Sequence, residues 1–268
     1  MEFSPLYNYP LWVAGLIFVA VLILTLEFGF QIGLKKREKW KDADSGGGNV
    51  VLTSMFALMG LVLAFTYAVG VGHYDARKKA VVIEANTLGT AFLKTNLVAE
   101  PARTELKTLL LDYARTRSFQ AETSKTDDDR NTFLRIAMVK QANIWSATMR
   151  AVNQGDPGPM ESSLVTSISE VFDAHTNRLS AILDKLPRVV MWMLLFISAT
   201  SLGVAGFNAG IQGRMSRWRM TAFSIVLSGL MIVILDFDRP GDGLIVIKTH
   251  SIDFAIASME AELKQGSK

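Results

Sequence analysis

The chain has 268 residues, half of them hydrophobic, with a formal net charge of +3 and no cysteine. So small a charge gives no support for a nucleic-acid partner, and the lack of cysteine excludes disulfides, thiolate metal sites and cysteine nucleophiles. The apolar residues are concentrated in four blocks, each long enough to cross a hydrocarbon core of roughly 30 Å as a helix. The composition therefore predicts an integral membrane protein.

The first two blocks predict membrane helices over residues 11–34 and 50–72, within an N-terminal domain of residues 1–72. The loop between them is basic, and the second block has no charged residue. The first block contains one acid, Glu27. Acids within membrane spans usually face a cavity or a partner. The alternative is that Glu27 lies at the membrane interface and extends to water, and the sequence favours neither.

Residues 73–186 form the only long polar region, and their pattern predicts a helical extramembrane domain between the second and third spans. Pro101 and the three acids at 127–129 predict the starts of two helices, because proline and negative charge both suit a helix N-terminus. Apolar side chains recur at spacings of three and four, which is typical of one helix face, at Leu106, Leu109, Leu110 and Tyr113.

The last two blocks predict membrane helices over residues 189–207 and 218–235, within a domain of residues 187–237. The remaining domain, 238–268, is expected to contain an amphipathic helix over residues 244–263 that packs on the extramembrane domain. The predicted fold class is all-α. Four spans place both termini on the same side as that domain, and the charges of the short loops favour an external location for it.

Four stretches of the chain are distinctive: residues 74–78 (YDARK), 84–93 (EANTLGTAFL), 100–103 (EPAR) and 236–240 (DFDRP). They resemble the bacterial bestrophin-like family of membrane proteins. The resemblance implies the layout of bestrophins, which are pentameric anion channels with four membrane helices per subunit and a cytosolic helical domain. It therefore implies a homo-oligomer of the inner (plasma) membrane that conducts small ions such as chloride. Because the loop charges favour the opposite side for the domain, its side stays open.

If the chain forms a channel, the second span is the best candidate to line the pore, at Phe56, Gly60 and Phe65. The alternative is that these residues pack against other helices or lipid. A basic collar follows the span and would attract anions if an oligomer arranged it as a ring. In a single chain it would bind lipid headgroups instead. Its members are His73, Arg77, Lys78 and Lys79.

Three acids follow the fourth span, and carboxylates this close together can bind a hard cation. They are Asp236, Asp238 and Asp242. They are too few for a complete calcium loop, so we expect a salt-bridged helix end in which Arg239 pairs with an acid such as Glu84. No nucleophile lies beside a base, and no two histidines have metal-binding spacing, so neither an enzyme nor a cofactor is expected. The alternative function is a non-conducting membrane scaffold or sensor whose helical domain binds a partner.

Overall fold

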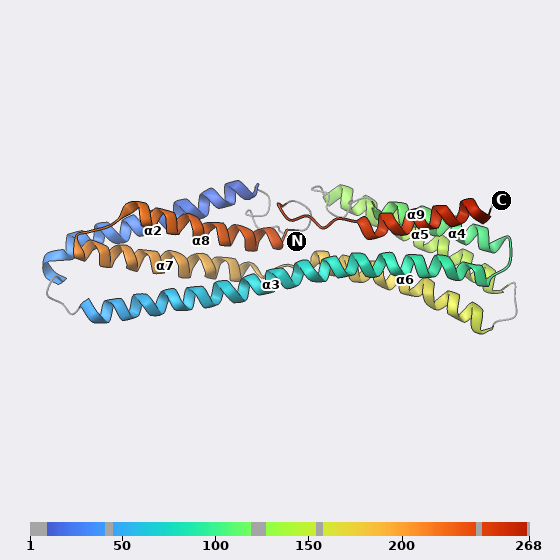
Figure 1. Ribbon diagram of the computed structural model, residues 1–268, viewed down its shortest axis with the longest axis horizontal. Coiled ribbons are helices and arrows are strands. Elements are labelled where there is room, and N and C mark those ends of the chain that lie inside the picture. The colour runs from blue at the N-terminus through green and yellow to red at the C-terminus, as the bar shows by residue number, and fades with distance from the viewer. Residues whose placement is uncertain (1–9, 41–44, 119–126, 154–157, 240–242, 267–268) are drawn as a thin grey trace. The chain divides into compact units, whose positions relative to one another are not determined.

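The computed structural model describes residues 10–40, 45–118, 127–153, 158–239 and 243–266. All regular elements in these residues are helices (Figure 1), so the all-α prediction is confirmed for this part of the chain. The helices are α2 (Leu11–Trp40), α3 (Ser45–Lys94), the short 3₁₀ helix η1 (Thr95–Leu97), α4 (Ala102–Ser118), α5 (Asp127–Asn153), α6 (Pro159–Leu183), α7 (Arg188–Gln212), α8 (Arg217–Phe237) and α9 (His250–Gly266).

The chain divides into two compact units. The first comprises Met1–His73 and Lys185–Arg239, and the second comprises Tyr74–Asp184 and Pro240–Lys268. The division falls inside α3, which stays helical beyond residue 72, where the predicted span ends. Polar residues such as Lys, Glu and Gln are good helix formers, so a change in polarity need not interrupt the backbone hydrogen bonds of a helix.

Four stretches are long and apolar enough to cross a membrane, and they include most of α2 and α3 and all of α7 and α8. In the first unit, α2 and α7 approach so closely that their backbones are in contact. A Cβ atom on Gly29 would overlap the carbonyl oxygen of Gly203, and one on Gly206 would overlap that of Leu26. Small residues permit this approach between membrane helices. The glycines of α2 and α7 thus determine the packing of this pair.

The larger apolar cluster in the core of the second unit receives side chains from five helices. Leu106 and Leu110 of α4 are fully buried in it, with Leu88 of α3, Ile144 of α5 and Met259 of α9. The α4 positions are those that the three- and four-residue spacing assigns to one face. The packed face of α4 therefore agrees with the sequence pattern.

The C-terminal helix begins later than predicted. The predicted helix starts at residue 244, but α9 begins at His250. The backbone N–H groups of Ile252 and Asp253 donate to the carbonyl oxygen of Thr249, which closes the first turn. The β-branched run at residues 245–247 has low helix propensity, because branching at Cβ restricts χ1.

Candidate functional sites

A buried cluster of charged side chains joins three helices of the second unit. Glu84 of α3 lies between Arg117 of α4 and Arg178 of α6. Arg117 Nε donates to Glu84 Oε1 at 2.8 Å, and Arg178 Nη1 donates to Oε2 at 2.6 Å. His175 of α6 lies close by, with Nδ1 at 3.6 Å from Oε1, which is beyond hydrogen-bond length. Since all four side chains are buried, the cluster is largely shielded from water and salt.

The surroundings of Glu84 keep it ionised. Burial by itself would raise the pKa of this carboxyl, but the neighbouring His175 and the guanidinium groups of Arg117 and Arg178 lower it to about 2. Burial also raises the pKa of Tyr113 beside the cluster to about 12, so this hydroxyl stays protonated. Glu84 and its two arginines therefore form a permanently charged clamp between helices.

The described partners of Glu84 are two arginines that the sequence analysis did not single out. The sequence predicted that Arg239 pairs with an acid such as Glu84, and this stays a prediction; the cations that the structure describes beside Glu84 are Arg117 and Arg178. A signal for both existed. Arg117 continues the buried stripe of Leu106, Leu110 and Tyr113 at helical spacing, and Arg178 continues the stripe of Leu164, Ile168 and Val171. A charge at a core position of a helix has to meet an opposite charge.

The structure also removes Arg77 from the predicted basic collar. Its side chain is buried, and it donates from Nε to the carbonyl of Ala181 at 2.9 Å and from Nη2 to that of Asp184 at 2.7 Å. The last carbonyls of a helix lack partners within the helix and attract a cation. Arg77 therefore binds the C-terminal end of α6. Lys78 and Lys79 are exposed, and His73, in the first unit, is half-buried.

The acids at the end of α8 are buried. Asp238 accepts a hydrogen bond at 2.7 Å from the backbone N–H of Leu186, just before α7, and Asp236 is equally buried. Asp242 lies outside the described residues. Among the residues that the structure describes, no group of three or more acids, histidines or cysteines is arranged to hold a metal ion. The described acids therefore offer a helix-end contact and no complete cation site.

The three pore candidates on α3 differ in their surroundings. Phe56 packs against the core of the first unit, and its ring meets that of Phe223 edge-on at 5.6 Å. Gly60 has open space where a Cβ atom would be, and Phe65 is 65% exposed. The structure thus turns Phe56 toward the other helices of the same chain, while Gly60 and Phe65 lie on the outer surface of α3.

Glu27 has polar neighbours in the first unit. Its Oε1 accepts a hydrogen bond from Gln31 Nε2 at 2.9 Å and lies 3.5 Å from Nη2 of Arg217, the first residue of α8. Basic residues at the start of an apolar helix usually lie at the membrane interface. The contact with Arg217 therefore favours the interfacial interpretation of Glu27.

Four long apolar helices and a second, helical unit define the class: the chain is a multi-pass membrane protein. Its fold is similar to the crystal structure of a bacterial bestrophin homologue from Klebsiella pneumoniae that carries a tyrosine-to-alanine mutation. The two agree with a TM-score of 0.61 at 9% sequence identity, over 89% of this chain and 98% of that one. Residues 12–252 match the Bestrophin-like domain family, so the chain belongs to that family, as its sequence motifs predicted. No curated protein gives a significant match.

Proposed function

We propose that the chain is the subunit of a homo-oligomeric membrane channel, of five subunits by analogy with bestrophins, that conducts small anions such as chloride. Membership of the Bestrophin-like family and the similar fold of a bestrophin homologue support a channel. We further propose that the second unit is the extramembrane domain and that the membrane is the inner (plasma) membrane.

One observation carries the proposal that α3 lines the pore. The apolar window of α3 is the least buried of the four, with 17% of it buried, against 39% for α8. Residues 50–72 contain no charged side chain. Because its own chain covers so little of α3, this is the helix that we expect to contact further subunits or to face a central pore.

The exposed surface of α3 has two kinds of residue side by side. Small residues at Ala57, Gly60 and Ala64 leave one strip flat, while Leu58 and Phe65 project from the neighbouring strip. Small residues let membrane helices approach closely, and rings of bulky apolar side chains gate ions by excluding water. In a ring of subunits, the small strip would suit a neighbouring helix and the bulky strip would constrict the pore.

The preference for anions rests on Lys78 and Lys79, which are exposed on α3 just beyond residue 72. Exposed cations repeated around a pore concentrate anions and repel cations. Because exposed charges are screened by salt, this contribution should weaken as ionic strength rises. Substitution of both lysines by glutamine should therefore lower the ratio of chloride to sodium permeability.

Reconstitution into liposomes tests the proposal. Purified protein should release chloride faster than protein-free liposomes, and Phe65→Ala should change the rate at least severalfold. Phe196→Ala is the matched control, because Phe196 is exposed to a similar extent, 69%, but lies on α7. If chloride release equals that of empty liposomes while the oligomer persists, the scaffold or sensor function replaces the channel. If the two variants change the rate equally, α3 does not line the pore.

A further inference from the structure

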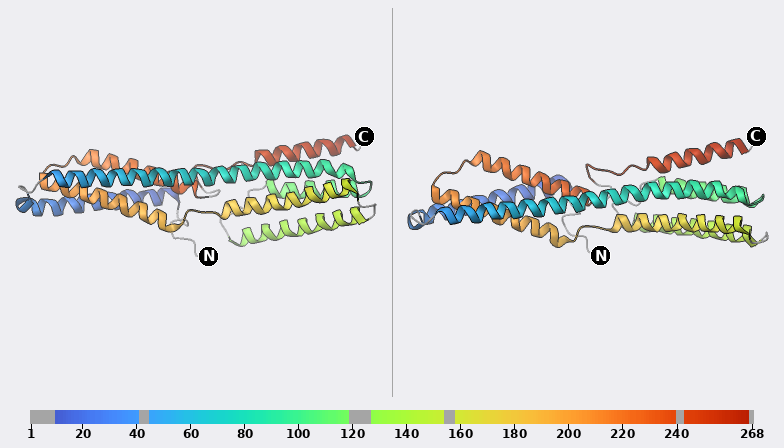
Figure 2. Two further views of the ribbon diagram at one scale, coloured as in Figure 1. Left: turned by 90° about the horizontal axis from the view of Figure 1, so that it is seen from below. Right: turned by 60° about the horizontal axis from the view of Figure 1, so that its bottom comes forward.

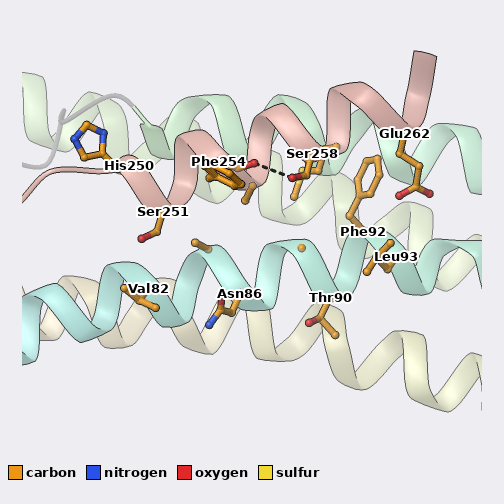
Figure 3. A pocket seen from close by; sticks show the side chains of 14 residues that line it. Val82, Asn86, Thr90, Phe92, Leu93, His250, Ser251, Phe254, Ser258 and Glu262 are labelled. Atoms are coloured by element: carbon orange, nitrogen blue, oxygen red, sulfur yellow. Dashed lines mark hydrogen bonds between the residues drawn. The ribbon is translucent and has the colours of Figure 1, made fainter. Parts of the chain in front are cut away.

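A groove runs between α3 and α9 on one side of the second unit (Figure 3). It has a volume of about 710 Å³, and most of the side chains that line it are apolar or small. Phe254 of α9 forms part of its rim and projects with 80% of its surface exposed, and Leu93 of α3 is exposed on the other side. A large exposed aromatic beside an apolar groove is typical of an interaction surface.

A second apolar surface lies on α5. Met138, Val139, Ala142 and Trp145 recur at helical spacing and are all exposed. Beside them is a shallow hollow of about 410 Å³, lined by Thr132, Arg135, Ile136, Val139 and Lys140. Both views of Figure 2 show α9 and α5 on opposite sides of the second unit. The unit therefore carries two different apolar surfaces that face away from each other.

The charges beside these two surfaces are complementary. Asp253 precedes Phe254 on α9; one of its carboxylate oxygens accepts a hydrogen bond from Ser118 Oγ, and about half of the side chain stays exposed. Arg135 lines the hollow on α5 and is exposed. The groove edge thus offers a half-exposed carboxylate, and the hollow offers an exposed guanidinium.

We infer that α5 of one copy of this chain lies in the α3–α9 groove of a second copy, with Phe254 inserted into the hollow beside Val139. Asp253 then faces Arg135, whose guanidinium can also lie against the ring of Phe254. This inference rests on the proposed homo-oligomer and names the surfaces that form it. Because the two surfaces differ and lie on opposite sides, the contact is heterologous, and a heterologous contact that closes on itself produces a ring.

Cysteine cross-linking tests the contact directly, because the natural chain has no cysteine to interfere. The full-length variant with Phe254→Cys and Val139→Cys, treated in detergent with a short thiol cross-linker, should give a ladder of linked species on a denaturing gel. The top of the ladder gives the subunit number. Either substitution alone should give almost none. The matched control pairs Phe254→Cys with Leu183→Cys, which is 68% exposed but lies on α6.

The inference is overturned if the paired variant gives no ladder, or if the α6 control gives an equal ladder. A dimer from Phe254→Cys alone would show a symmetric contact instead of a ring. A second measurement covers cysteine variants that fold poorly. Arg135→Glu and Asp253→Arg should each reduce the oligomer fraction severalfold in native mass measurements, and their combination should restore it. Lack of restoration would also reject the contact.

The same preparations separate this inference from the channel proposal. A ladder without chloride release would retain the contact and reject the channel. Chloride release without a ladder would retain the channel and reject the contact between α5 and the groove.

Discussion

Replacing Glu84 with glutamine tests whether the buried cluster stabilises the second unit. The substitution preserves the size of the side chain but leaves Arg117 and Arg178 buried without their carboxylate. Lowering the pKa of Glu84 from its ordinary value of 4.5 to about 2 corresponds to about 3 kcal/mol in favour of the folded state. Loss of one member of a buried ion pair typically costs about 3–5 kcal/mol, which agrees. We therefore expect a loss of about 3 kcal/mol at neutral pH.

Thermal unfolding of the purified protein in detergent measures this loss. For a unit of this size, about 3 kcal/mol corresponds to a fall in Tm of about 6–12 °C. Glu100→Gln is the matched control, since Glu100 is mostly exposed and its salt bridge with Arg103 is on the surface. We expect Glu100→Gln to leave Tm unchanged. A Tm for Glu84→Gln within 1–2 °C (about 0.5 kcal/mol) of the natural chain would refute the role of the cluster.

The same pair of proteins gives a pH dependence with a definite sign. Because the pKa of Glu84 is lower in the folded state than in the unfolded state, its stabilisation is present in full above pH 4.5. It is lost as the pH falls from 4.5 toward 2. The difference in Tm between the natural chain and Glu84→Gln should therefore be constant near neutral pH and shrink through that acid range. A difference that grows in acid would contradict the assignment.

Three further substitutions test local contacts. Gly206→Val should destabilise the first unit by at least about 2 kcal/mol, because the new side chain would overlap the backbone of α2. Gly229→Val should not destabilise it, because the space around Gly229 is open. Melting curves in detergent compare the two variants. Arg77→Met should speed hydrogen exchange at the C-terminal end of α6, since two carbonyls lose their donor, and unchanged exchange there would contradict the role of Arg77. Asp238→Ala should cost about 1–3 kcal/mol by leaving the N–H of Leu186 unpaired, while Asp238→Asn retains an acceptor and should cost less.

The sequence alone was sufficient for the membrane class, the four apolar helices and the family. Hydrophobicity over 20 residues is a local property, and a helix satisfies its own backbone hydrogen bonds within one segment. The packed face of α4 followed from spacing for the same reason, since neighbouring turns of one helix determine which residues share a face. The family rested on short motifs, which can be read without knowing what they contact.

Only the tertiary structure decided which distant residues meet. It gave Glu84 two arginines from other helices, directed Arg77 to the end of α6, and separated Phe56 from Gly60 and Phe65 on α3. Charge and size limit what each side chain can contact, but several arginines are equally suited to one carboxylate. The choice among them depends on which helices become neighbours, and helices far apart in the chain become neighbours through the packing of the whole core.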